Sequence, residues 1–269
     1  KGDALDAFLA EKGESIVAVA TNGGDGLKTE VMDRLPNLKV ISNYGVGYDA
    51  IDATHAASRG IVVTHTPNVL NDEVANTAIL LWLATSRKLA AYDAYVRAGR
   101  WEKEGGTPLT KSPQGRTVGI VGLGRIGQAI ADRLPVFGAR VVYHSRSKKD
   151  VEYDYFADLT EMARAADVLI VITPGGVETK HLIDREVIDA LGPEGILVNV
   201  ARGSVVDETA LIAALQDGRL WGAGLDVFEG EPHVPEAFFG MENVVLQPHI
   251  GSATKETRAA MGQLTCDNL

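Results

Sequence analysis

Thr-Val-Gly-Ile-Val-Gly-Leu-Gly-Arg-Ile-Gly occupies residues 117–127 and indicates the fold of the whole chain. Residues 117–121 are apolar and rich in β-branched side chains, which predicts a buried strand. The pattern Gly-x-Gly-x-x-Gly follows at once, and helical periodicity then continues to Leu134. A strand, a glycine-rich turn and a helix in this order are typical of a dinucleotide-binding βαβ unit.

Each glycine of this turn has its own expected role. Gly122 allows a tight turn out of the strand, Gly124 lets the backbone approach a pyrophosphate, and Gly127 lets the helix pack on the strand. The free N–H groups at the start of the helix would face the phosphates. An ordinary βα turn of another α/β fold is the alternative. The expected cofactor contacts at the turn are Gly122, Leu123, Gly124, Arg125, Ile126 and Gly127.

Composition excludes several classes of protein. The 269 residues are 45% hydrophobic and 23% charged, which suits one or two globular domains. The longest apolar run, residues 78–84, is far below the roughly 20 residues of a membrane span. The net charge of −10 argues against nucleic-acid binding. The single cysteine, Cys266, excludes an internal disulfide and a cysteine metal cluster, so we expect no metal and a reducing cytoplasm.

Helical and strand patterns alternate before the glycine turn, which indicates βα units and a parallel sheet. Helices are expected at residues 3–12, 27–35 and 51–58, and strands at residues 16–20, 38–42 and 61–64. The alternation begins on a helix without a preceding strand, so we expect the chain to lack its first βα segment.

The longest helical pattern runs from Asn71 to Ala98 and ends at Gly99. Residues 78–84 are apolar on all sides, so both faces of this helix should be buried. A helix that joins two domains or forms a subunit interface would satisfy this pattern, and so would a central core helix.

Further βα units follow the glycine turn and predict a doubly wound parallel sheet, the Rossmann fold. Strands are expected at residues 140–143, 168–172, 196–200, 222–226 and 244–246, with a helix at residues 208–216. Ligands of this fold bind at the carboxyl ends of the strands.

The end of the second strand favours NADP over NAD. Chains that bind NAD usually carry Asp or Glu about 20 residues after the glycine turn, to bind the ribose 2′-hydroxyl. Residues 144–148 read His-Ser-Arg-Ser-Lys and offer no carboxylate. Ser145 and Arg146 could donate charge-assisted hydrogen bonds to a 2′-phosphate, and Lys148 adds positive charge. The alternative is an exposed Arg146 and NAD bound without an acidic partner.

Candidate catalytic residues follow the later strands. Arg202 comes after an apolar strand, and its guanidinium suits a carboxylate. His249 lies between a proline and an isoleucine at a strand end and suits general acid–base chemistry. Of the remaining histidines, His144 is a possible neighbour of the adenosine. The others are expected on the surface or in loops: His55, His65, His181 and His233.

Six motifs in order resemble the D-isomer-specific 2-hydroxyacid dehydrogenases, and most closely their NADPH-dependent glyoxylate/hydroxypyruvate reductase branch. The motifs are Tyr44-Gly45-Val46-Gly47-Tyr48-Asp49, Thr66-Pro67-Asn68-Val69-Leu70, the stretch from Val121 to Gly127, Ala201-Arg202-Gly203, Glu231-Pro232 and Pro248-His249-Ile250-Gly251-Ser252-Ala253.

The resemblance implies a catalytic set of Arg202, Glu231 and His249. Glu231 would orient His249 and favour its protonated ring. His249 would then donate a proton to the ketone oxygen during hydride transfer, and would act as the base in the reverse direction. Arg202 would bind the carboxylate of the 2-oxoacid and polarise its carbonyl.

The resemblance also implies binding residues. The backbone amides of Val46 and Gly47 would bind the substrate carboxylate, and Ser252 is a further substrate candidate. Asp226 would accept a hydrogen bond from the nicotinamide carboxamide. The remaining expected cofactor contacts are Thr173, Pro174, Thr179, Val200, Ala201, His249 and Gly251.

A substrate domain of residues 1–67 and 253–269, flavodoxin-like and smaller, is implied beside a dinucleotide-binding domain of residues 68–252. The active site would lie in the cleft between them, and the chain would form a homodimer through the cofactor domain. The function implied is reduction of a small 2-oxoacid by NADPH. The alternatives are an NAD-linked dehydrogenase of another substrate, such as a phosphoglycerate or formate enzyme, and a non-catalytic dinucleotide-sensing module.

Overall fold

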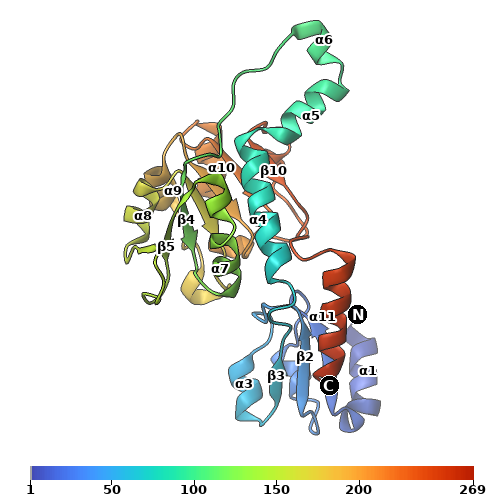
Figure 1. Ribbon diagram of the computed structural model, residues 1–269. Helices are drawn as coiled ribbons and strands as arrows, with labels where there is room; N and C mark the ends of the chain where they lie inside the picture. The colour runs from blue at the N-terminus through green and yellow to red at the C-terminus, as the bar shows by residue number, and fades with distance from the viewer. Residues whose placement is uncertain (1) are drawn as a thin grey trace. The chain divides into compact units, whose positions relative to one another are not determined.

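A computed structural model describes residues 2–269, with side chains from residue 4 onward. The chain divides into two compact units (Figure 1). Residues up to Leu70 together with Ala253–Leu269 form the smaller unit, and Asn71–Ser252 form the larger unit.

The smaller unit contains a three-stranded parallel sheet in the order β1-β2-β3. Its strands are β1 (Ala18–Asn22), β2 (Val40–Tyr44) and β3 (Val62–Thr64), and its helices are α1 (Gly2–Lys12), α2 (Thr29–Met32), α3 (Ala53–Ser58) and α11 (Lys255–Asp267), with a 3-10 turn η1 (Gly13–Ser15). Met32, Ile41 and Ala56 are fully buried in its core. Helix α11 lies along β2, where the Ser42 hydroxyl donates to the Thr265 carbonyl at 2.9 Å. The expected alternation of helices and parallel strands is therefore confirmed.

Helix α2 is shorter than the helix expected at residues 27–35. It ends at Met32, and Asp33–Leu35 continue as a turn in which the Arg34 amide donates to Val31 at 3.1 Å. Pro36 follows, and the residue before a proline is disfavoured in helical conformation. The proline therefore explains why the helix does not extend through Leu35.

The larger unit contains a seven-stranded parallel sheet in the order β10-β9-β8-β7-β4-β5-β6. Its strands are β4 (Thr117–Val121), β5 (Arg140–His144), β6 (Asp154–Tyr155), β7 (Val168–Val171), β8 (Ile196–Asn199), β9 (Gly222–Leu225) and β10 (Val244–Leu246). The chain runs outward from β4 to β6 and then returns to the other side of β4 as β7. This reversal is the switch point of a doubly wound fold, as the sequence predicted.

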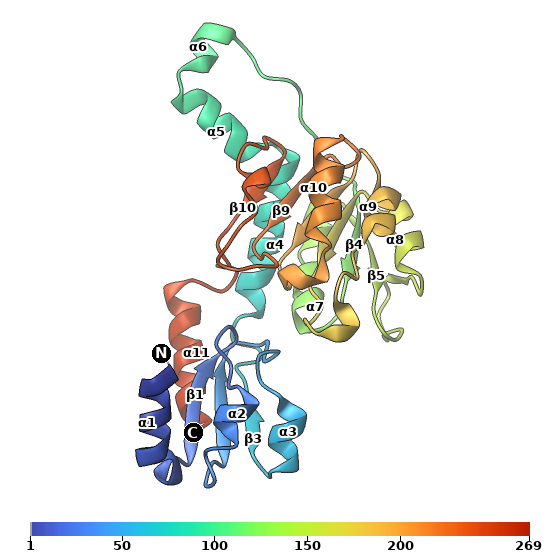
Figure 2. The ribbon, with the colours of Figure 1, turned by 180° about the vertical axis from the view of Figure 1, so that it is seen from behind.

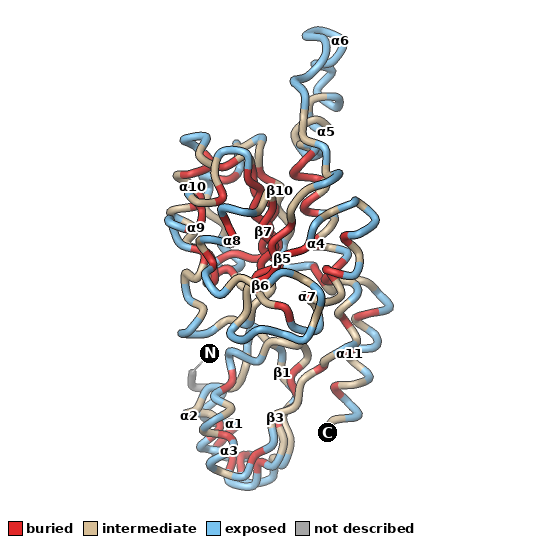
Figure 3. Tube along the Cα trace, turned by 60° about the vertical axis from the view of Figure 1, so that its left-hand side comes forward, coloured by how far each residue is buried: buried red, intermediate tan, exposed pale blue. Residues whose placement is uncertain are grey.

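Helices cover both faces of this sheet (Figure 2). On one side lie α4 (Asn71–Ser86) and α7 (Arg125–Ala131), and on the other α8 (Leu159–Ala165), α9 (Arg185–Leu191) and α10 (Glu208–Gln216). Every residue of β7, β8 and β9 is buried, which the tube in Figure 3 shows as the red centre of this unit. Within residues 2–269, no helix combines the length and the hydropathy that a bilayer span requires.

The single helix expected from Asn71 to Ala98 is wrong. Helix α4 ends at Ser86, and Lys88 adopts the left-handed conformation with φ 49° before α5 (Leu89–Arg97) begins. The Ser86 hydroxyl donates back to the Trp82 carbonyl at 2.8 Å, a hydrogen bond that slightly destabilises the end of the helix. The expected burial on all sides is also wrong, because Leu80 is 49% exposed while Trp82 is fully buried. Helix α4 packs on β8, β9 and β10 and is a core helix of the larger unit.

An arm, residues 89–110, extends from the larger unit (Figure 1). It contains α5 and a short helix α6 (Arg100–Glu104), and neither helix has a buried residue. Its exposed apolar side chains are Leu89, Val96, Trp101 and Leu109. The arm therefore presents apolar surface that the rest of the described chain does not cover.

Candidate functional site

The glycine turn lies at the switch point between β4 and β7. A Cβ added to Gly122, whose φ is 104°, would lie 2.9 Å from the Ile172 carbonyl oxygen. A Cβ on Gly127 would lie 2.2 Å from the Gly122 oxygen, whereas a Cβ on Gly124 would meet nothing within 4 Å. Gly122 and Gly127 are thus needed for packing within the chain, while the space at Gly124 is open for a ligand.

The wall next to this turn carries an unpaired polar atom. The hydroxyl oxygen of Thr173 is buried without a hydrogen-bond partner among the described residues. The hydroxyl of Thr179 donates to the Pro174 carbonyl at 2.7 Å, which closes the loop after β7. Buried polar atoms are nearly always paired, so the Thr173 hydroxyl fits a site that a polar ligand completes. Together with the open space at Gly124, it fits a bound dinucleotide.

The loop after β5 contains the residues expected to select the cofactor. Ser145 donates through its hydroxyl to the Ser147 carbonyl at 2.7 Å, and Tyr155 donates to the Ser145 carbonyl at 3.2 Å. Arg146 and Lys148 are exposed, and the described chain offers neither of them an ion pair. The hydroxyl of Ser145 therefore has a structural partner, which leaves Arg146 as the principal candidate for a 2′-phosphate contact.

Glu231 and His249 lie side by side. His249 Nδ1 is 2.7 Å from Glu231 Oε2, and the other carboxylate oxygen of Glu231 accepts the Phe228 amide at 2.9 Å. Glu231 belongs to the loop after β9, and His249 follows the neighbouring strand β10. The expected contact between Glu231 and His249 is therefore present within the larger unit.

The charged form of Glu231 is favoured by its surroundings. Burial alone would raise the pKa of Glu231, but the hydrogen bonds from His249 and the Phe228 amide outweigh it. The positive charges of His249 and Arg202 act in the same direction, so the pKa of Glu231 lies below its ordinary value. Glu231 is thus an ionised acceptor for the imidazole at neutral pH.

The loop that carries His249 is tied to Asp226. His249 has a left-handed backbone with φ 54°, and its amide donates to the Asp226 carbonyl at 2.7 Å. The two carboxylate oxygens of Asp226 accept the amides of Ile250 and Gly251, both at 2.8 Å. Burial raises the pKa of Asp226, although these two hydrogen bonds oppose the shift. A strained backbone conformation persists only where its surroundings hold it, and here the hydrogen bonds to Asp226 hold that of His249.

Arg202 follows β8, the next strand of the sheet. The side chain of Asn199 donates to the Arg202 carbonyl and accepts the Ala201 amide, both at 3.0 Å. The adjoining Gly203 packs against the loop of Glu231, because a Cβ there would lie 1.9 Å from the Phe228 carbonyl carbon. Val200 and Ala201 are buried, so any contact they make with a cofactor is limited to a small exposed part.

A second polar network adjoins the Glu231 loop and was not anticipated. His181 Nε2 lies 3.0 Å from Glu229 Oε1, and Glu208 accepts the Glu229 amide at 2.7 Å. Burial raises the pKa of Glu208, and the negative charges of Glu229 and Glu231 act in the same direction. The sequence placed His181 in a loop but gave no signal for this network, since its members are far apart in the chain.

The remaining expected substrate residues lie in both units. Val46 and Gly47 are half-buried in the loop after β2 of the smaller unit. Ser252 closes the larger unit and is half-buried beside Gly251, whose carbonyl accepts the Thr77 hydroxyl at 3.2 Å.

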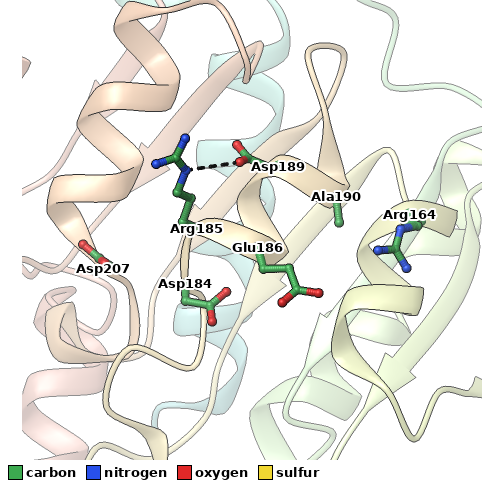
Figure 4. A pocket seen from close by; sticks show the side chains of 7 residues that line it. All are labelled: Arg164, Asp184, Arg185, Glu186, Asp189, Ala190 and Asp207. Atoms are coloured by element: carbon green, nitrogen blue, oxygen red, sulfur yellow. Dashed lines mark hydrogen bonds and ion pairs between the residues drawn. The ribbon is translucent and has the colours of Figure 1, made fainter.

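A surface pocket of the larger unit contains none of the expected site residues (Figure 4). It is lined by Arg164, Asp184, Arg185, Glu186, Asp189, Ala190 and Asp207. Asp184 and Asp207 cap helices α9 and α10 through the amides of Val187 and Ala210. Arg185 and Arg219 pair with Asp189. Most of these charges are therefore engaged within the fold, and the described residues contain no cluster of His, Cys, Asp and Glu suited to a metal ion.

Comparison with known proteins identifies the family. Residues 79–251 match the model of the D-isomer specific 2-hydroxyacid dehydrogenase NAD binding domain. The chain is 51% identical to hydroxyphenylpyruvate reductase of Plectranthus scutellarioides, with 97% of this chain and 84% of that protein covered. It is 50% identical to glyoxylate/hydroxypyruvate reductase A of Arabidopsis thaliana, with 95% and 82% covered.

A solved structure is equally similar. The NADPH-dependent glyoxylate/hydroxypyruvate reductase of Sinorhizobium meliloti, in complex with NADP and malonate, has a TM-score of 0.92 and 50% sequence identity. The match covers 96% of this chain and 81% of that chain. With its Rossmann sheet, its glycine turn and its Glu231–His249 pair, the chain belongs to the D-isomer specific 2-hydroxyacid dehydrogenase family.

Proposed function

We propose that the chain reduces small 2-oxoacids such as glyoxylate or hydroxypyruvate to the D-2-hydroxyacid, with NADPH as the hydride donor. The observation that carries this proposal is the hydrogen bond of 2.7 Å between His249 and an ionised Glu231. The reductase activities of the relatives at about half sequence identity support it. Arg202, after the neighbouring strand β8, adds the cation that a 2-oxoacid requires.

His249 is the proton donor of the proposed reaction. Its Nδ1 is hydrogen-bonded to Glu231, so Nε2 is the nitrogen available to the ketone oxygen of the substrate. When bound, NADPH would supply the hydride for the carbonyl carbon, and His249 would donate the proton that completes the hydroxyl group. The neutral imidazole is then reprotonated from solvent, with Glu231 holding its orientation. Arg202 binds the carboxylate and stabilises the negative charge that develops on the carbonyl oxygen.

The larger unit is proposed as the cofactor domain and the smaller unit as the substrate domain. The glycine turn would hold the pyrophosphate, and the buried Thr173 hydroxyl would gain a partner. Arg146 would bind the 2′-phosphate of NADPH, since residues 144–148 at the end of β5 include no carboxylate that would repel it. The amides of Val46 and Gly47 and the side chain of Ser252 would contact the substrate.

The chain is further proposed to act as a cytoplasmic homodimer. The uncovered apolar surface of the arm supports a second copy as its partner. The single, free cysteine is consistent with a reducing compartment.

A panel of 2-oxoacids, assayed with NADPH and with NADH, tests the function. We expect turnover of glyoxylate or hydroxypyruvate with NADPH, and a loss of kcat of roughly 100-fold or more in His249→Ala. Arg146→Ala should weaken NADPH far more than NADH. Equal effects on both cofactors would contradict the NADP preference. Tight NADPH binding without turnover of any 2-oxoacid would favour a dinucleotide-sensing module instead.

A further inference from the structure

The loop after β2 has every carbonyl of residues 45–47 tied down within the smaller unit. The Gly45 oxygen accepts the side-chain amide of Asn43 at 3.2 Å and the Thr66 amide at 3.0 Å. The Val46 oxygen lies 3.0 Å from His65 Nδ1. The Gly47 oxygen accepts a second hydrogen bond from Asn43 at 3.0 Å. Two side chains, of Asn43 and His65, and the backbone amide of Thr66 thus fix three successive peptide units.

The backbone amides of the same loop, unlike its carbonyls, are mostly left without a hydrogen-bond partner within the described part of the chain. The Gly45 amide donates to the Thr66 hydroxyl at 3.1 Å, whereas those of Val46 and Gly47 have no acceptor among the described residues. Gly45 has φ 148°, a conformation that only glycine adopts readily. Successive amides left over in a loop of this kind form a concave binding site for an anion.

We propose that Asn43, His65 and Thr66 are positioning residues that hold the amides of Val46 and Gly47 ready for the carboxylate of the substrate. The proposal rests on the 2-oxoacid reductase function stated above. The three side chains do not touch the substrate themselves. They orient the peptide groups that do, so that little ordering is needed when the carboxylate binds.

The burial of Asn43 argues against a purely space-filling role. Its side chain is fully buried, and its oxygen has no hydrogen-bond partner among the described residues. An apolar side chain would fill the same space without leaving a buried acceptor unpaired, so filling space does not explain an asparagine here. The amide nitrogen, in contrast, makes two hydrogen bonds to the loop, so its donor capacity is the part of the residue in use.

His65 is anchored for the same task. Its Nδ1 faces a carbonyl oxygen and must therefore carry the proton. The edge of its ring meets Tyr48 with 5.4 Å between the ring centroids, and its own carbonyl accepts the side chain of Asn268 at 3.3 Å. These contacts hold the donor on the Val46 oxygen.

His65 offers the sharpest test, since it is only partly buried and tolerates substitution better than Asn43 or Thr66. His65→Leu removes the donor to Val46, whereas His65→Asn retains a donor nitrogen near the position of Nδ1. His55→Leu is the matched control, because His55 belongs to the same unit and contacts Asp33 rather than the loop. We expect His65→Leu to raise the KM for glyoxylate about tenfold with kcat little changed, the pattern of lost uniform binding.

The same variants are titrated with malonate by calorimetry, using the NADPH-loaded protein. The Kd of malonate should rise about tenfold in His65→Leu, recover in His65→Asn and stay unchanged in His55→Leu. Thr66→Val, which removes only the acceptor for Gly45, should weaken malonate in the same direction. The Kd of NADPH should be unchanged in all four variants.

Unchanged malonate binding in His65→Leu, or failure of His65→Asn to restore it, would overturn the proposal. So would an equal loss of NADPH and malonate binding in His65→Leu, because that pattern indicates general damage to the fold. The malonate titration does not require turnover. A wild-type chain that binds malonate but reduces no 2-oxoacid would therefore contradict the proposed function, and the role of Asn43, His65 and Thr66 in carboxylate binding would still stand.

Discussion

At the scale of single residues, the proposed chemistry depends on which ring nitrogen of His249 is free to donate a proton. The bond from Nδ1 to Glu231 fixes the ring and leaves Nε2 for the substrate. The lowered pKa of Glu231 means that this partner stays charged over the whole physiological range. A carboxylate that stays ionised at neutral pH keeps the imidazole in one tautomer and one orientation.

Glu231→Gln should lower kcat by roughly 100-fold or more, because the neutral amide neither fixes the tautomer nor stabilises the protonated imidazole. It should also change how stability depends on pH. The pKa of Glu231 is depressed in the folded state, so its stabilising contribution is present above the ordinary carboxyl range and is lost as the pH falls through the folded value. The free energy of unfolding of the variant should therefore be lower than that of the wild type at pH 7.

Denaturant unfolding at pH 7 and near pH 3 measures this difference, which should shrink at the lower pH as Glu231 protonates. Glu242→Gln is the control, because Glu242 is exposed and removing its charge should have little effect at either pH. A gap between wild type and Glu231→Gln that widens on acidification would show that the sign is wrong.

The sequence carries a signal for some of these candidate residues and none for others. Arg202, Glu231 and His249 lie in recognisable motifs after strands. A guanidinium, a carboxylate and an imidazole at such positions indicate carboxylate binding and acid–base chemistry. Asn43 and His65 act on backbone carbonyls, and a hydrogen bond to a carbonyl leaves no pattern in the order of side chains. Their roles emerge only when the loop conformation is known.

At the scale of elements, local patterns predicted best where burial and capping agree. Strand β4 has the expected bounds, and helix α10 begins where Asp207 caps the amide of Ala210 at 2.9 Å. The break after Ser86 was missed, because the left-handed conformation of Lys88 is not demanded by its side chain. Strand β6 was missed because a strand of two residues is too short to show an alternating pattern of apolar and polar side chains. It is defined only by its pairing with β5.

The loops after β8 and β9 meet at Gly203, and this contact should control activity. A Cβ at residue 203 would overlap the backbone of Phe228 and Glu229, at 1.9 Å and 2.2 Å, so no side-chain rotation can relieve it. Gly203→Ala should therefore separate the loop of Arg202 from that of Glu231. We expect a loss of about 1–3 kcal/mol in the free energy of unfolding and roughly 100-fold in kcat/KM.

Gly240→Ala is the matched control, because a Cβ at residue 240 meets nothing within 4 Å. Its stability should stay within about 0.5 kcal/mol of the wild type. If Gly203→Ala retained full activity and stability, the close packing of the two loops would not be required for catalysis.

At the scale of the whole molecule, the arm is the part whose stability and exposed apolar surface a single chain does not explain. Helix α5 has nine residues and α6 has five, and neither contains a buried residue. Isolated helices shorter than about 12–15 residues are marginal in water. Helix α5 contacts α4 and β10 only at its base, so most of the arm surface stays uncovered. A second copy of the chain can cover it symmetrically.

Light scattering should accordingly give a particle of about twice the chain mass of 28.6 kDa. Leu89→Glu and Trp101→Glu place a charge on apolar side chains of the arm that are 56% and 62% exposed, and desolvating that charge in an interface is unfavourable. Both variants should shift the particle toward the mass of one chain. Val136→Glu is the control, since Val136 is 82% exposed in the larger unit outside the arm and should leave the mass unchanged. A wild-type monomer, or a dimer that survives both substitutions in the arm, would show that these side chains face solvent in the working molecule. The stability of α5 and α6 would then come from the contacts of α5 with α4 and β10 and from the intrahelical pairs Arg97–Asp93 and Arg100–Glu104.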